Sequence, residues 1–157
     1  MKLQKLFENW DMQGLKLNLG VLEMEWKPQE KDREAAWELY VELLTRGATQ
    51  PLSADQGVET AALESIFSLF PTTREILRSK GRECSQFTLV AVVVLNQVIR
   101  PFTEKWHRLS EAGALLNAKH CAEFRAELAA LQSQLLKYCG LLAEIAQVED
   151  LAALKAD

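Results

Sequence analysis

The sequence has few of the residues that build metal sites and disulfide scaffolds. It contains two histidines and three cysteines among 157 residues. Cys84, Cys121 and Cys139 show no Cys-x-x-Cys spacing, and an odd number of cysteines is typical of the reducing cytosol rather than of a secreted domain. His120 directly precedes Cys121, and neighbouring side chains on a helix point about 100° apart, so the two cannot easily share an ion. We therefore expect no metal site and a cytoplasmic location.

Several motifs of nucleotide-binding and hydrolytic enzymes are also absent. The sequence has no GxxxxGK[ST] phosphate loop, no GxGxxG after a strand, no HExxH and no GxSxG. We therefore expect no cofactor. These absences favour a protein that is not an enzyme, but they leave a metal-independent activity open.

Long hydrophobic runs are missing as well. The longest, Leu89–Leu95, has seven residues, whereas a membrane-spanning helix needs ~20. The N-terminus carries Lys2 and Lys5 but no apolar stretch of signal-peptide length. We expect a soluble protein without a membrane partner, and the compact, Leu- and Ala-rich composition suggests a bacterial one.

Glycine and proline are sparse, and the segments between them have helical periodicity. A chain of 157 residues corresponds to one domain at roughly 100–200 residues per domain. Apolar residues recur at i, i+3, i+4 and i+7 after Pro28, which predicts a mainly all-α bundle of four to five helices over residues 29–157. The expected helices are 29–46, 57–70 (closed by Pro71), 72–80, 82–111 and 118–147, followed by a short acidic helix over 148–157.

Residues 1–28 show a different pattern and are expected to form an arm or hairpin. Leu15, Leu17 and Leu19 alternate with polar residues and glycine, and after a one-residue slip the alternation resumes from Leu22. Period-two alternation is typical of strands, and a slip indicates a bulge or a tight turn. We therefore predict an N-terminal β-hairpin or extended arm within a single domain spanning 1–157.

The four tryptophans divide between these two regions. Trp37 lies in the apolar stripe of helix 29–46, and Trp106 lies in helix 82–111, so both are expected in the core. Trp10 and Trp26 lie in the arm, where aromatic residues often anchor interfaces. Together with the arm residues Leu17 and Leu19, they form the predicted contact surface for a second subunit or another protein.

Helix 82–111 contains the most distinctive polar pattern. Its first half, residues 87–95, is apolar all round, which predicts burial on every side. In its second half Arg100 and His107 are seven residues apart, close to two helical turns, so both emerge on nearly the same line with Glu104 between them. Such i,i+4 and i,i+3 pairs also occur on ordinary solvated helix faces.

The Arg100-x6-His107 pattern resembles the Rx4-6H motif of the HEPN superfamily. Members of that superfamily are small all-helical domains, frequently dimeric, and many are metal-independent RNases. The resemblance implies that Arg100 stabilises a scissile phosphate and that His107 acts as acid or base. Glu104, which lies between them on the strip, is a third candidate catalytic residue. The sequence departs from the motif at Pro101, where the superfamily prefers a small polar residue.

The net charge of −4 conceals an uneven distribution. Residues 1–71 carry 7 basic and 12 acidic side chains, whereas residues 72–111 carry 7 basic and 4 acidic ones. A basic segment of this kind can attract phosphate or an acidic partner surface, including the acidic half of a second copy. The basic cluster comprises Arg74, Arg78, Lys80 and Arg82.

Two functions follow from these features. The first is a non-enzymatic helical protein–protein interaction module that self-associates, as a dimer, or joins a larger complex. The second is a HEPN-like metal-independent RNase or toxin/antitoxin-type component, with RNA as its partner. The helical segments and the residue spacings favour the interaction module.

Overall fold

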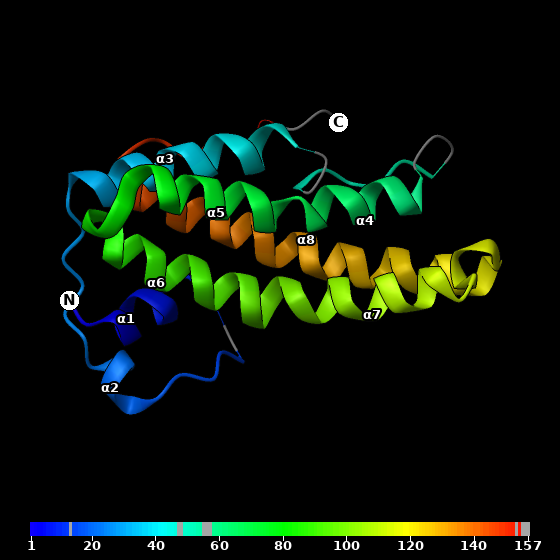
Figure 1. Cartoon of the computed structure of the whole chain (residues 1–157), viewed down its shortest axis with the longest axis horizontal. Helices are drawn as coiled ribbons and strands as arrows, with labels where there is room; N and C mark the ends of the chain where they lie inside the picture. The colour runs from blue at the N-terminus through cyan, green and yellow to red at the C-terminus, as the bar shows by residue number, and fades with distance from the viewer. Residues whose placement is uncertain (13, 47–48, 55–57, 153, 155–157) are drawn as a thin grey trace.

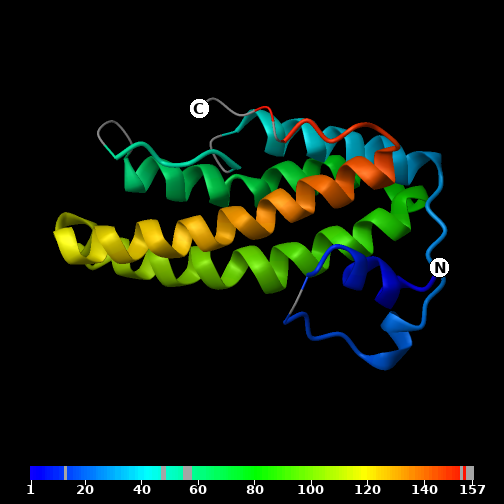
Figure 2. The ribbon, with the colours of Figure 1, turned by 180° about the vertical axis from the view of Figure 1, so that it is seen from behind.

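The computed structural model describes residues 1–12, 14–46, 49–54, 58–152 and 154. Over these residues the chain is mainly α-helical, as predicted. Four helical segments lie side by side, and successive segments run in opposite directions (Figures 1 and 2). The helices of these segments are α3 (Glu30–Thr45), α4 (Glu59–Phe67), α5 (Leu69–Lys80), α6 (Ser85–Val94), α7 (Arg100–Glu111) and α8 (Ala118–Ala146). They are joined by the 3₁₀ turns η2 (Gly81–Cys84) and η4 (Ala114–Leu116) and by the π-helical segment η3 (Leu95–Ile99).

Two helix boundaries differ from the prediction. The helix expected over 57–70 ends at Phe67, and α5 begins at Leu69 with Pro71 in its first turn, where a missing N–H leaves no helical hydrogen bond unmade. The acidic helix expected over 148–157 is absent from 148–152 and 154, and the remaining residues lie outside the described part. Gln147 adopts a left-handed conformation with φ 60° and ends α8 there.

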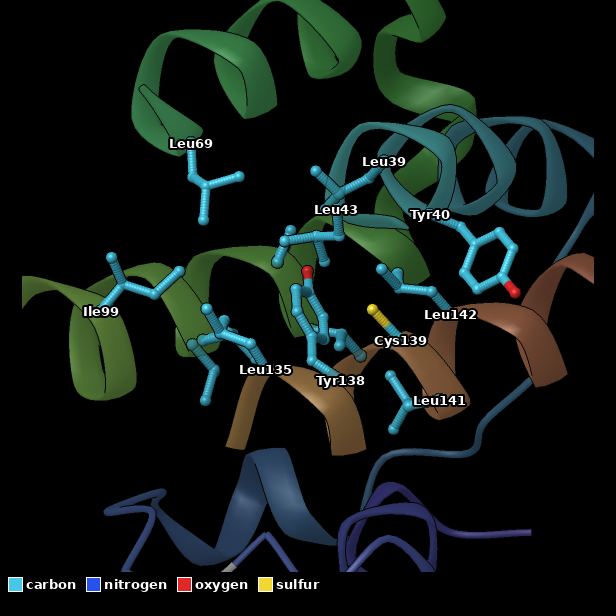
Figure 3. Packing of buried hydrophobic residues seen from close by; sticks show 14 of the residues in the cluster. Leu39, Tyr40, Leu43, Leu69, Ile99, Leu135, Tyr138, Cys139, Leu141 and Leu142 are labelled. Atoms are coloured by element: carbon cyan, nitrogen blue, oxygen red, sulfur yellow. The ribbon is translucent and has the colours of Figure 1, made fainter. Parts of the chain in front are cut away.

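The core lies between α3, α8 and the α6–α7 segment. Leu39 and Leu43 of α3 pack towards Leu135 and Leu142 of α8 (Figure 3). Trp106 is fully buried, as predicted, and its ring meets Phe124 of α8 edge-on at a centroid distance of 5.1 Å.

The buried face of α3 is displaced from the predicted one. Trp37 was expected in the core but is 47% exposed. Ala35 and Ala36 are buried although they are small, so they do not stand out in a pattern of large apolar residues. Leu39, Tyr40 and Leu43 are large and buried, whereas Trp37 belongs to an outward stripe of this helix. The buried residues of α3 are Asp32, Ala35, Ala36, Leu39, Tyr40 and Leu43.

A buried carboxylate connects the start of α3 to the start of α6. Asp32 is 1% exposed and accepts hydrogen bonds from the backbone N–H of Gln29 at 2.7 Å and of Phe87 at 2.8 Å. The first bond belongs to a capping box at the start of α3, and the second satisfies an N–H in the first turn of α6. One side chain thus caps two helices.

The predicted N-terminal β-hairpin is wrong: the described part of the arm contains two short helices, α1 (Leu3–Asn9) and α2 (Leu19–Leu22). Its β-type pairing is confined to an isolated bridge between Lys2 and Glu25. The slip in the alternation is the helical turn α2, which Asn18 caps by accepting from Val21 N–H at 2.8 Å.

The extended stretch before α2 pairs with a side chain instead of a strand. The side-chain amide of Gln97, in η3, accepts from Lys16 N–H at 2.6 Å and donates to Lys16 C=O at 2.8 Å. Such a pair satisfies the backbone groups of Lys16 as a neighbouring strand would. The alternating pattern therefore belongs to an extended segment of the arm that lies against the helical bundle.

Candidate functional site

The candidate site is built around the irregular middle of the α6–α7 segment. Pro101 has no N–H for the carbonyl of Gln97, and the backbone widens into the π-helical segment η3 just before it. The residues of α7 after this segment turn one polar strip towards α4 and α5. Arg100 is the first residue of that strip and His107 lies two turns further along.

Arg100 is held by three neighbours. Its Nε donates to Asn96 Oδ1 at 3.1 Å, and its Nη1 lies 3.9 Å from Glu104 Oε1. The guanidinium also lies over the ring of Phe70 in α5, 4.7 Å from the centroid, a cation–π geometry. The side chain remains exposed, so its charge is accessible to a ligand.

His107 faces α4 rather than Glu104. Its ring meets Phe67 edge-on at a centroid distance of 4.8 Å, and Nε2 lies 3.4 Å from Glu64 Oε1. Glu104 contacts Arg100 only through the 3.9 Å pair and is otherwise exposed. The three predicted catalytic residues therefore share one strip, but each of Arg100 and His107 has its own aromatic and acidic partners.

An open groove lies beside this strip, between α5 and the α6–α7 segment. Its volume is about 390 Å³. Most of its lining residues are apolar, and the polar ones are Arg74, Arg100 and Asn96. We call it the basic groove. Its lining residues are Phe67, Phe70, Arg74, Leu77, Val92, Leu95, Asn96 and Arg100.

Two apolar side chains in the basic groove are open to solvent. Val92 is 41% exposed and Phe67 is 42% exposed. Val92 belongs to the all-apolar run that predicted burial on every side, so that prediction fails on the face turned to the basic groove. Phe67 was not singled out from the sequence, where it reads as an ordinary core position of its helix. Contiguous exposed apolar surface is typical of interaction sites, whereas single exposed apolar residues are ordinary.

The predicted basic cluster is divided by the fold. Lys80 turns to α3, where its Nζ lies 2.8 Å from Glu38 Oε1 and 3.3 Å from Glu34 Oε2, and these carboxylates raise its pKa. Arg78 and Arg82 are exposed beyond the basic groove. Arg74 alone of the four lines it.

The arm residues are largely used within the chain. Trp10 packs on Gly140 of α8, and its indole N–H donates to Glu144. Leu17 and Trp26 are partly buried against the core. Leu19 is exposed and is the arm residue best placed to contact another molecule.

The cysteines show no sign of a reactive or metal-binding role. Cys84 and Cys139 are buried, and burial raises the pKa of the Cys139 thiol to about 12, which keeps it protonated and unreactive. Cys121 is partly exposed and its thiol contacts Leu115 C=O at 3.1 Å. Among the described residues no three His, Cys, Asp or Glu side chains gather as a metal site would require.

One helical stretch has the length and composition of a membrane span. The range Glu59–Glu111 contains a window with a mean hydropathy of 1.2, and 44% of that window is buried in the protein. Core helices of soluble proteins share these properties. The expected absence of a membrane partner therefore stays a prediction.

Comparison with known proteins adds no identification: no family model matches the chain, and neither a curated protein nor a solved structure matches it. The function of the basic groove has to be inferred from its own geometry.

Proposed function

We propose that the chain is a helical protein–protein interaction module and that the basic groove is its contact surface. The exposure of Val92 carries this proposal, because α6 is otherwise composed for burial and its neighbours Ala91, Val93 and Val94 are buried. Covering Val92 and Phe67 with a partner would remove apolar surface from water, at about 25 cal/mol per Å².

The chemistry of the basic groove also supports a protein partner. Arg74 and Arg100 in its lining favour acidic side chains around an apolar anchor, and arginine is enriched in protein interfaces. No cofactor or metal is needed for such a role. We place the protein in the cytoplasm, where three free thiols are compatible with the redox conditions.

A substitution at Val92 tests the proposal. We expect Val92→Asp to abolish the native assembly, because a carboxylate cannot be buried against an apolar partner without a large desolvation cost. The protein is purified from the organism that produces it, and native mass spectrometry then shows whether a second copy of the chain or another protein is bound at a fixed stoichiometry. Leu116→Asp is the matched control, since Leu116 is 94% exposed outside the basic groove. A monomer in wild type and variant alike would contradict the proposal, provided that circular dichroism shows both to be folded.

A HEPN-like RNase is the second candidate, favoured by one observation. Arg100 and His107 lie on one strip of α7, and neither side chain is fully buried. An accessible arginine and imidazole can together stabilise a phosphate and transfer a proton. Their ring contacts with Phe70 and Phe67, however, are also what a structural role requires.

An RNA cleavage assay separates the two functions. If the second is correct, Arg100→Ala and His107→Ala leave the helical content unchanged and lower cleavage of total RNA at least about a hundredfold. Our proposal predicts that wild type at high concentration cleaves no more RNA than the two variants do.

A further inference from the structure

A second groove lies on the other side of α5, between α5 and α3. Its volume is about 630 Å³, and its exposed anchor is Trp37. Three carboxylates surround the apolar residues, so we call it the acidic groove. Its lining residues are Trp37, Glu38, Val41, Glu42, Pro71, Thr72, Glu75 and Ile76.

The two grooves flank α5 on the same face of the molecule. Figure 1 shows α5 in front, with α3 on one side and α6 on the other, whereas α8 lies behind. The exposed side chains of Trp37 in α3, Val92 in α6 and Phe67 at the end of α4 line the two grooves beside α5, and we call the surface that holds both grooves the α3–α5–α6 face.

Charge differs in sign across the face. Arg74 lines the basic groove and Glu75 lines the acidic groove. Both side chains are exposed, and within the described residues neither has an ion-pair partner; Arg74 Nε donates a hydrogen bond within its own helix, to Phe70 C=O at 3.4 Å. Glu38 and Glu42, by contrast, are paired with Lys80 and Arg46.

We infer that the partner of this face is a second copy of the same chain, bound so that α5 meets α5 and the basic groove of each copy faces the acidic groove of the other. This inference rests on the proposed function and names its partner. The face carries both halves of a complementary surface, an apolar anchor with cations on one side of α5 and an apolar anchor with carboxylates on the other. A two-fold symmetric contact requires this self-complementarity.

The arrangement of α5 selects one orientation of the two copies. A half-turn about an axis parallel to α5 places the α6 side of one copy over the α3 side of the other. A half-turn about an axis that lies in the same face but is perpendicular to α5 places the basic groove of one copy over the basic groove of the other. Arg74 and Glu75 differ by about 1.5 Å in height along the helix. The parallel arrangement therefore places Arg74 of each copy opposite the partner's Glu75.

The size of the face predicts a reversible dimer. The 12 residues of α5 span about 18 Å, and three neighbouring helices span about 20–30 Å. Such a face is smaller than a standard specific interface, which buries about 800 Å² per partner, and has the size of weak, transient ones. We therefore expect an equilibrium between monomer and dimer that shifts with protein concentration and weakens as salt screens the charges.

A charge exchange on the intact chain tests the inference. Sedimentation velocity between about 1 and 300 μM should show wild type passing from monomer to dimer. Arg74→Glu and Glu75→Arg should each raise the dimer dissociation constant at least about tenfold, because like charges then face each other. The double variant Arg74→Glu/Glu75→Arg exchanges the charges on both copies and should restore most of the affinity. Lys119→Glu, at the start of α8, is the control for a charge change elsewhere.

The following outcomes would overturn the inference. A wild-type monomer across the concentration range, or a dimer indifferent to both single variants and to Trp37→Ala, excludes this mode of pairing. If native mass spectrometry shows a different protein lost on Val92→Asp, the second-copy inference fails while the proposed function stands. If the wild type has no companion at all, both fail. Binding to phosphatidylcholine/phosphatidylglycerol vesicles that Val92→Asp abolishes would assign the face to a membrane.

Discussion

At the scale of single residues, Asp32 shows how one buried polar group organises two helices. Its carboxylate accepts hydrogen bonds from the N–H of Gln29 at the start of α3 and from the N–H of Phe87 at the start of α6, and the second bond is buried. The sequence pattern marks Asp32 only as an acidic residue in the first turn of a helix. Its bond to Phe87 joins positions 55 residues apart, and no local pattern reports such a contact.

We predict that Asp32→Ala lowers the free energy of unfolding by about 2–4 kcal/mol, because it removes half of the capping box of α3 and leaves the buried N–H of Phe87 unpaired. Urea unfolding followed by circular dichroism measures this loss. Asp32→Asn keeps one acceptor oxygen in nearly the same shape and should cost clearly less. A loss below about 0.5 kcal/mol for Asp32→Ala would show that the bonds are not made in solution.

At the scale of elements, the N-terminal arm is held on α8 by a close contact. A Cβ atom at Gly140 would lie 2.4 Å from Cζ3 of Trp10, closer than the atoms can approach. The arm therefore depends on a glycine in the middle of a helix, where alanine is intrinsically more stable by about 1 kcal/mol.

We predict that Gly140→Ala displaces the arm while leaving the bundle folded. Hydrogen exchange of residues 1–12 should become faster, with little change in α3 or α6. In a Trp10→Ala background the clash is gone, and Gly140→Ala should then be neutral or stabilising by up to about 1 kcal/mol. The same loss in both backgrounds would mean that Trp10 does not occupy this position.

The helices themselves were predictable, and the errors have two different causes. Periodicity located the helical segments because each buries an apolar stripe. It gave the wrong face for α3, because Ala35 and Ala36 face the core while Trp37 faces outward, and that depends on which neighbour α3 packs against. It missed α2 because Asn18 caps a helical turn inside an alternating pattern, which is a local bond to Val21.

At the scale of the whole molecule, the candidate site was predicted only in part. The Arg100–His107 strip follows from helical geometry, but its partners Phe67, Phe70 and Glu64 come from α4 and α5 and have no signature at that distance in the sequence. The basic groove could not be predicted without knowing that α5 lies beside α6, and the acidic groove could not be predicted without knowing which stripe of α3 faces outward. The net charge does not reveal that the fold places basic residues on one side of α5 and acidic residues on the other.

The most direct test of the central claim, that a second copy of the chain covers this face, is the sedimentation of wild type and Val92→Asp side by side over rising concentration. We predict a reversible dimer for the wild type and a folded monomer for the variant, with Leu116→Asp behaving as the wild type. A wild-type protein that stays monomeric, or a variant that dimerises equally well, would contradict the claim that a second copy covers this face.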